Sequence, residues 1–164
     1  MTNLFWQDRN LFSRELVRFG VVNGKNAGML LGYTGQQRND ILLHTGRLLI
    51  DYFRGRFIGV LPRLLKANRL LTSPGKDEFY VSSLAVYPEF RGKGVATALL
   101  LDAEKRAASA EAKRLVLDVE VENSAALNLY RKLGFEDARP PRSTRIGGTE
   151  FHFVKMVKTV NPRV

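Results

Sequence analysis

Two different periods of hydrophobic and polar residues run along this chain, and each period predicts a type of element. Two short apolar runs, Val17–Val22 and Ala27–Tyr33, flank the polar stretch Asn23-Gly24-Lys25-Asn26. Asn and Gly both accept positive φ, so this arrangement predicts two antiparallel strands joined by a tight turn. Residues 4–18 mix apolar and charged residues at roughly helical spacing, which predicts a short helix at the start of the chain.

Helical spacing dominates residues 40–72. Gly59 and Pro62 divide this segment and predict two helices, because proline fits the first turn of a helix. Eight Lys or Arg residues stand against two Asp residues between positions 38 and 76, so this part of the chain carries +6 of the net charge of +10. The apolar positions that recur at this spacing are Leu42, Leu49, Phe53, Phe57, Leu61, Leu64, Leu65 and Leu71.

From residue 78 onward, strand and helix patterns alternate. The predicted elements are a strand over Phe79–Val86, a helix over Val95–Ala110, a buried strand over Arg114–Val121, a helix over Ser124–Leu133 and a final strand over Phe151–Val157. Such alternation predicts an α/β fold, with a mixed central sheet and helices on both of its faces. At 164 residues the chain is long enough for one domain with a substantial core, so we expect residues 1–164 to form a single domain.

Composition excludes several classes of site. The chain has no cysteine, which rules out a disulfide framework, thiolate metal sites and a cysteine nucleophile, and fits a reducing cytoplasm. We expect a soluble cytoplasmic protein, because no apolar run is long enough for a membrane span and the start lacks a signal-peptide pattern. His44 and His152 stand alone without ligand spacing, so we predict no metal site. The net charge of +10 favours anionic partners of some kind.

The stretch Arg91-Gly92-Lys93-Gly94-Val95-Ala96 lies between a predicted strand and a predicted helix. A glycine-containing turn at a helix start directs several backbone N–H groups into one space, where the helix dipole also favours an anion such as a pyrophosphate. Gly92 and Gly94 let the backbone approach a ligand, and Arg91 and Lys93 add charge. The pattern is neither a Walker loop nor a dinucleotide fingerprint, and a purely structural turn is the alternative interpretation.

Two blocks of sequence together carry a family resemblance. Leu84-Ala85-Val86-Tyr87-Pro88-Glu89 precedes the turn Arg91–Ala96, which has the form Arg/Gln-x-x-Gly-x-Gly/Ala. About thirty residues later come five residues in the pattern Asn-x-x-Ala-x-x-x-Tyr-x-x-x-Gly-Phe: Asn123, Ala126, Tyr130, Gly134 and Phe135. In order and spacing, residues 78–136 resemble the GNAT superfamily of acyl-CoA N-acyltransferases, and in particular its ribosomal-protein alanine acetyltransferases.

The resemblance implies an acetyl-CoA site. The pantetheine arm would pair with the backbone of the strand that ends at Val86, and the pyrophosphate would lie on the turn Arg91–Ala96. Asn123 would touch the cofactor or position the following helix. The alternative interpretation is that Asn123 is only a helix cap. The cofactor-binding residues implied in this way are Leu84, Ala85, Val86, Arg91, Gly92, Lys93, Gly94, Val95, Ala96, Asn123 and Tyr130.

The resemblance also implies catalytic roles. Tyr130 would lie beside the sulfur and protonate the departing thiolate, unless it is only a core aromatic residue. Asp118 matches the position of the acidic base in the alanine acetyltransferases, and Glu120 lies two residues further on the same strand face. Glu78 and Tyr80 lie where other members place their base. Each of these residues also has a purely structural interpretation, and water is another candidate base.

The acceptor side departs from the family pattern. Most members have a strand and two helices before the hairpin, whereas here about sixteen residues precede it. Either the chain is truncated, or its natural start lies elsewhere, or residues 40–72 replace that wall. We expect this helical insertion to cover the acceptor side of the cleft or to form a homodimer.

The leading hypothesis for function is an N-acetyltransferase that moves acetyl from acetyl-CoA to a primary amine by direct attack. The acceptor is either a protein or peptide amino terminus or a small molecule, and the resemblance at Asp118, Asn123 and Tyr130 favours the amino terminus. The alternative is a non-catalytic module that binds CoA, nucleic acid or an anionic surface through residues 40–72. This segment lacks a recognisable nucleic-acid motif, so we expect no DNA partner.

Overall fold

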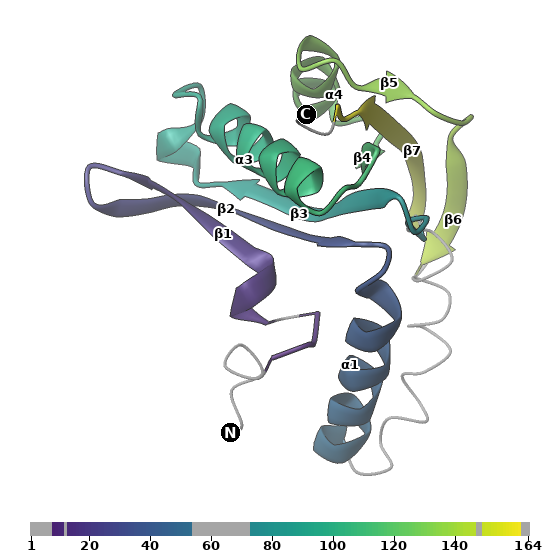
Figure 1. Cartoon of the computed structure of the whole chain (residues 1–164). Helices are drawn as coiled ribbons and strands as arrows, with labels where there is room; N and C mark the ends of the chain where they lie inside the picture. Colours follow the sequence, from purple (N-terminus) through teal and green to yellow (C-terminus); the bar gives the residue numbers. More distant parts are fainter. Residues whose placement is uncertain (1–7, 12, 54–72, 147–148, 162–164) are drawn as a thin grey trace.

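The computed structural model describes residues 8–11, 13–53, 73–146 and 149–161 (Figure 1). These residues form a seven-stranded sheet in the order β1-β2-β3-β4-β7-β5, with β6 also paired to β7. The β3–β4 pair is parallel and the other pairs are antiparallel. The strands are β1 (Val17–Val22), β2 (Lys25–Thr34), β3 (Glu78–Val86), β4 (Arg114–Glu120), β5 (Glu136–Asp137), β6 (Arg142–Ile146) and β7 (Thr149–Thr159). The helices are α1 (Arg38–Phe53), α3 (Val95–Ser109) and α4 (Ser124–Lys132), with 3-10 turns η2 (Arg14–Leu16) and η3 (Pro88–Phe90).

The predicted hairpin is present as β1 and β2. Asn23 and Gly24 both have positive φ, at 50° and 73°, as a tight two-residue turn requires. The helix predicted over residues 4–18 is wrong in its described part, where Arg14–Leu16 forms a single 3-10 turn and Val17 already begins β1. Val17 pairs with Leu31 and is buried, so sheet pairing overrides the helical spacing of this segment.

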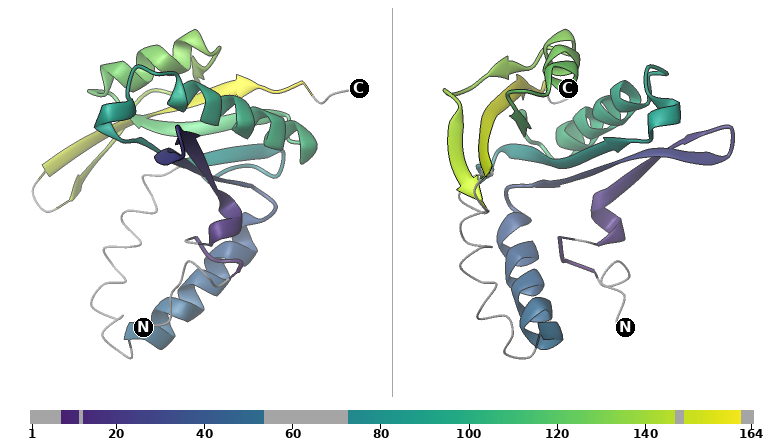
Figure 2. Two further views of the ribbon diagram at one scale, coloured as in Figure 1. Left: turned by 90° about the vertical axis from the view of Figure 1, so that its left-hand side faces the viewer. Right: turned by 180° about the vertical axis from the view of Figure 1, so that it is seen from behind.

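One face of the sheet is covered by α3 and α4 (Figures 1 and 2). Helix α3 lies across β1 to β4 and buries the side that carries Leu99, Ala103 and Ala107. Helix α4 adds Leu127 and Tyr130 to the same apolar core. We refer to this side of the sheet as the α3 face.

The opposite face has a smaller core, in which Leu16, Ile41 and Tyr80 take part, and we refer to it as the acceptor face. Helix α1 begins on this face and then projects away from the sheet (Figure 1). Among the side chains of α1 that the structure describes, Ile41 and Thr45 are buried, whereas Leu43 is 73% exposed. Leu42, which the spacing placed on the buried stripe, is only half-buried.

The second predicted helix, with Gly59 and Pro62, lies outside the described residues, as do the apolar positions between 57 and 71. Within the described part, α1 and η2 are therefore the elements that cover the acceptor face. Strands β5 and β6 were not predicted. The strand β6 reads Arg-Ser-Thr-Arg-Ile, which lacks apolar alternation, and its residues Ser143 and Arg145 are exposed.

Candidate active site

A gap opens between the parallel strands β3 and β4. Their pairing runs from Glu78 with Arg114 to Val81 with Leu117. Strand β3 nevertheless continues to Val86 and β4 continues to Glu120. From residue 82 onward, none of the described strands pairs with the edge of β3 that faces β4. Such an edge can accept an extended, amide-containing chain in the manner of an added strand.

A β-bulge explains why the two strands separate. Opposite β3, Gly32 pairs with Val81 while the preceding Leu31 pairs with Ser83, which leaves Ser82 as an extra residue. A bulge of this kind bends a strand and increases its twist. Beyond it, Leu84 and Val86 pack on the α3 face, as Phe79 and Val81 do before it. The sequence contains the signal, because the apolar positions 79, 81, 84 and 86 break the period of two at residue 82.

The predicted anion turn lies at the outer end of β3. Gly92 and Gly94 have positive φ of 73° and 78°, and a Cβ added at either glycine would meet no heavy atom within 4 Å. Both positions therefore need glycine for their backbone conformation and also leave open space beside the backbone. Gly94 is the N-cap of α3 and offers no side-chain cap. The first N–H groups of the helix thus face this space together with the positive end of its dipole.

The two basic side chains of this turn, Arg91 and Lys93, are exposed to solvent. Lys93 Nζ lies 5.4 Å from the centre of the Phe90 ring. Arg91 Nε lies 3.4 Å from the carbonyl oxygen of Val86. Both side chains can therefore turn toward an anion at the helix start without breaking a buried contact.

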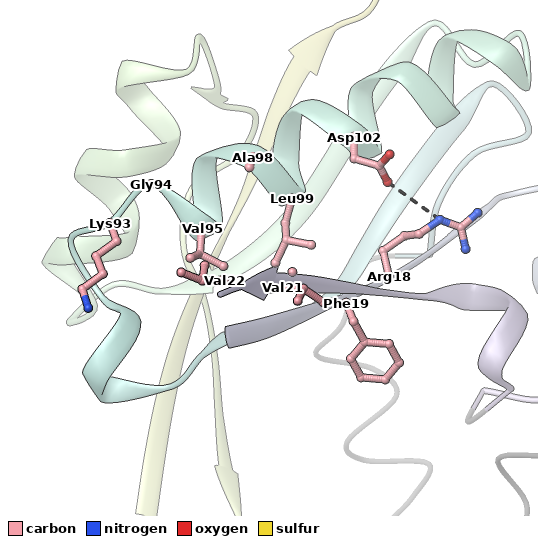
Figure 3. A pocket seen from close by; sticks show the side chains of 11 residues that line it. Arg18, Phe19, Val21, Val22, Lys93, Gly94, Val95, Ala98, Leu99 and Asp102 are labelled. Carbon is pink, nitrogen blue, oxygen red and sulfur yellow. Dashed lines mark ion pairs between the residues drawn. The ribbon is translucent and has the colours of Figure 1, made fainter. Parts of the chain in front are cut away.

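A groove of about 360 Å³ lies beside the same turn (Figure 3). It begins at Lys93 and Gly94 and follows α3 as far as the ion pair between Arg18 and Asp102, whose Nε and Oδ2 atoms are 3.9 Å apart. Its other wall is the edge strand β1. Because β2 and β3 lie between β1 and the gap, this groove is separate from the gap between β3 and β4.

Asp118 is the first residue of β4 beyond the last β3 partner. Its side chain is only 2% exposed. Its Oδ2 accepts a hydrogen bond of 2.9 Å from the Tyr80 hydroxyl, and its Oδ1 lies 3.8 Å from Nη2 of Arg142 on β6. Burial, together with the charge of Asp118 and the hydrogen bond to it, raises the pKa of Tyr80 far above its usual value. Tyr80 is therefore a fixed neutral donor, and Asp118 is an anchored carboxylate at the closed end of the gap.

The other candidate carboxylates have different surroundings. The Glu78 carboxylate is buried, and lies 3.1 Å from Lys155 Nζ, 2.9 Å from the backbone nitrogen of Gly75 and 3.5 Å from Arg114 Nε. With these partners it holds the start of β3, which supports its structural interpretation. Glu120 is half-buried on the same face as Asp118, two residues further along β4.

Tyr130 and Asn123 lie on α4. Tyr130 is 8% exposed, and its ring centre is 5.7 Å from that of Phe135. Burial raises the pKa of Tyr130, so it keeps its proton at neutral pH. Asn123 is the N-cap of α4, and its Oδ1 accepts a hydrogen bond of 3.1 Å from the Ala126 N–H. The cap role predicted as the alternative for Asn123 is thus present, and its contact with the cofactor stays a prediction.

The strand pairing places only some of the predicted residues at the gap. Leu84, Ala85 and Val86 form its β3 edge, and Asp118 closes its end from the acceptor face. Tyr130 comes from the α3 face. Sequence reasoning missed Arg142, because it lies in an unpredicted strand. The described residues contain no group of His, Asp and Glu that could hold a metal ion, and no described helix is long and apolar enough to cross a membrane.

Comparison with known proteins identifies the family. The model of the acetyltransferase (GNAT) family matches residues 5–135. The chain belongs to this family. The match confirms the predicted family resemblance and the predicted α/β GNAT fold.

Two curated relatives of this GNAT chain are N-alpha-acetyltransferases. N-alpha-acetyltransferase 30 of Schizosaccharomyces pombe is 36% identical over 80 residues, which cover 49% of this chain and 51% of the relative. The N-alpha-acetyltransferase of Sulfurisphaera tokodaii is 36% identical over 110 residues, 61% of this chain and 62% of the relative. The chain thus spans between about half and about three fifths of these relatives' length.

Solved structures share the fold at low sequence identity. The ribosomal-protein-S18-alanine N-acetyltransferase of Escherichia coli has a TM-score of 0.54 at 18% identity, over 85% of this chain and 65% of that one. A chain from the NatC complex bound to Gag peptide and CoA has a TM-score of 0.58 at 21% identity, over 90% of this chain and 72% of that one. These similarities show a common architecture.

Proposed function

We propose that this GNAT chain is an acetyl-CoA-dependent N-acetyltransferase, and that its acceptor is the α-amino group of a protein or peptide. The observation that carries the proposal is the gap between β3 and β4, which has the glycine-containing turn at the start of α3 at its outer end and Asp118 at its closed end. A long ligand with phosphates at one end and a reactive group at the other matches this arrangement of sites.

The described residues fit acetyl-CoA as the donor. The backbone edge of Leu84, Ala85 and Val86, which no described strand pairs on the β4 side, would pair with the amides of the pantetheine arm. The open space at Gly92 and Gly94, with Arg91 and Lys93 beside it and Val95 and Ala96 contributing N–H groups, would hold the pyrophosphate. Asn123 would keep the start of α4 in place beside the arm through its cap.

The reaction needs one group that takes a proton and one that gives a proton. The amine nitrogen attacks the acetyl carbonyl carbon, a C–N bond forms and the C–S bond breaks. Asp118 accepts the proton that the amine loses, directly or through a water molecule, with Glu120 as the next carboxylate on that face. Tyr130 is protonated at neutral pH and donates its proton to the departing thiolate. A backbone N–H of the free β3 edge would stabilise the carbonyl oxygen.

Three kinds of support favour a peptide acceptor. The two curated relatives act on N-alpha amines by name, and the NatC structure contains a peptide together with CoA. Asp118 bonds to Tyr80 of the acceptor-face core, on the side of the sheet opposite α3 and α4. We further propose that residues 1–164 form one domain, that residues 40–72 line the acceptor side or a homodimer contact, and that the cysteine-free chain works in the cytoplasm.

The direct test is a transfer assay with purified protein, acetyl-CoA and a panel of short peptides with free or blocked amino termini. Mass spectrometry should find one added acetyl group on the free α-amine and none on the blocked peptides, and thiol release should match it. Binding of CoA without any transfer would instead favour the non-catalytic module. Transfer only to small amines would remove the peptide part of the proposal.

A further inference from the structure

The side chain of Tyr80 reaches Asp118 along one face of the sheet. Tyr80 pairs with Val116 of β4, and Asp118 lies two residues further along β4, so the two side chains are diagonal neighbours on the same face. Aromatic side chains are long enough to bridge such a diagonal. The Tyr80 hydroxyl accordingly donates a hydrogen bond of 2.9 Å to Oδ2 of Asp118. A tyrosine at position 80 thus supplies a donor that the shorter hydroxyl of a serine or threonine would not bring to the same carboxylate.

Tyr80 itself is held in place by its neighbours. It is 2% exposed and belongs to the core of the acceptor face. On β2 its cross-strand partner is Tyr33, and the two rings pack edge to face with centres 5.7 Å apart. Tyr80 also precedes the bulge at Ser82, so it lies in the part of β3 that still pairs with β4. The hydroxyl is therefore a fixed donor next to the point where the gap begins.

The state of the Tyr80 proton decides what this residue can do in the reaction. Burial, together with the charge of Asp118 and the hydrogen bond to it, raises the pKa of Tyr80 far above its usual value. Tyr80 therefore keeps its proton at neutral pH, and its hydroxyl is not the base that deprotonates the amine. The Asp118 side chain is only 2% exposed, and a buried carboxylate needs hydrogen bonds to be stable in its charged form.

We propose that Tyr80 is a positioning residue for acetyl transfer, whose hydroxyl holds the Asp118 carboxylate in one orientation and stabilises its charged form. The inference rests on the proposed function, in which Asp118 is the base. During the step, the proton of the attacking amine passes to Asp118, directly or through a water molecule. The proton of Tyr80 stays on its own oxygen throughout. Tyr80 thus acts on the rate through Asp118 and not through the reacting atoms.

Other groups near Asp118 stay in place when the Tyr80 hydroxyl is removed. Arg142 Nη2 lies 3.8 Å from Oδ1 of Asp118. Lys155 is the cross-strand partner of Asp118 on β7, with its Nζ 3.1 Å from both carboxylate oxygens of Glu78. A Tyr80→Phe substitution keeps the ring, its packing and these charges, and removes only the donor to Oδ2. Its effect on the rate therefore measures this one hydrogen bond.

The experiment is a double-mutant cycle of Tyr80→Phe and Asp118→Asn in the transfer assay. The acceptor is the free-terminus peptide of the panel that is acetylated fastest, and mass spectrometry over hours follows the slow variants. Tyr80→Phe alone should lower kcat by about 10- to 100-fold, the range for one hydrogen bond to a charged group. In the Asp118→Asn background it should change kcat by less than about twofold, because the group through which it acts is already lost.

The KM values and a matched variant separate positioning from a loss of structure. The KM for acetyl-CoA and the KM for the peptide should each change by less than about threefold in Tyr80→Phe, since the inferred role is in the chemical step. Tyr33→Phe is the control, because it removes the hydroxyl of the ring that packs on Tyr80 and leaves the Tyr80 to Asp118 hydrogen bond intact. Its kcat should stay within about threefold of the wild type.

The possible outcomes lead to different conclusions. A kcat that Tyr80→Phe leaves unchanged overturns the inference, as does an equal loss with and without Asp118→Asn, because Tyr80 then does not act through Asp118. An equal loss in Tyr33→Phe also overturns it, since the packing of the two rings would then explain the effect. In all three cases the acetyltransferase proposal stands, because the wild type still transfers. Absence of transfer by the wild type refutes that proposal, and the inference fails with it.

Discussion

The turn at Gly94 offers a test in which the effect on folding and the effect on ligand binding can be separated. Gly94 has a φ of 78°, and no heavy atom lies within 4 Å of the position of an added Cβ. A Gly94→Gln substitution therefore meets no clash in the free protein. Its cost to folding is the left-handed backbone conformation, about 1–2 kcal/mol for a non-glycine residue. For a chain of this size that corresponds to a Tm lower by about 2–8 °C.

Gly24 provides a matched control. It has a φ of 73° and likewise no neighbour within 4 Å, but it lies in the β1–β2 turn rather than at the helix start. Gly24→Gln should therefore lower the Tm by a similar amount. Only Gly94→Gln places a side chain in the space where the phosphates of CoA would lie. The two variants separate the cost of the backbone conformation from the loss of the binding site.

The assay is thermal unfolding with and without CoA. At a concentration 100 times its Kd, CoA should stabilise the wild type and Gly24→Gln by about 2.7 kcal/mol, a Tm rise of about 5–11 °C. If Gly94→Gln weakens binding about 100-fold, the same CoA concentration contributes only about 0.4 kcal/mol, or about 1–2 °C. An equal rise in all three proteins would show that the turn is structural, and no rise in the wild type would remove CoA from the proposal.

Three further predictions concern single side chains. Tyr130→Phe should lower kcat by about 10²–10⁴-fold, because the proton donor is lost. The Kd for acetyl-CoA should change by less than about twofold, because the packing of the ring remains. Equal kcat values for the variant and the wild type would make Tyr130 a core residue only. Asp118→Asn should lower or shift the rising limb of the pH–rate profile, and an unaltered limb would exclude Asp118 as the base. Glu78→Gln should lower the free energy of unfolding, measured by urea titration, by about 3–5 kcal/mol, because it leaves Lys155 buried without its anionic partner. A loss below about 1 kcal/mol would contradict the structural role of this pair.

The elements that sequence analysis predicted correctly depend on local chemistry. The turn at Asn23 and Gly24 needs positive φ at two consecutive residues. Asn and Gly are the residue types that adopt this conformation most readily, so the sequence itself predicts the turn. The same holds for Gly92 and Gly94, and for Asn123 as a helix cap. The family motifs then gave the order of the elements around the gap. Apart from that order, each of these features is determined by a few consecutive residues.

The features that were missed depend on residues far apart in sequence. The approach of Arg142 to Asp118 requires β6 to pair with β7, and β7 to pair with β4. The polar sequence of β6 carries no period that marks it as a strand, and among the described strands it pairs with β7 alone. The expected helix over residues 4–18 failed for a related reason: Val17 gains more from pairing with Leu31 than from its own helical spacing.

The alternation of side chains along β4 divides the proposed chemistry between the two faces of the sheet. Leu117 and Val119 point into the α3 face core, to which Tyr130 also belongs. Asp118 therefore points to the opposite face, since successive residues of a strand alternate. The bulge at Ser82 lies next to the point where the pairing of β3 with β4 ends, which is also where Asp118 follows the last paired residue of β4. An acetyl donor held in the gap would then meet an amine that arrives from the acceptor face. The sulfur of the donor would lie toward Tyr130, on the other side of the acetyl group. Direct attack requires this arrangement.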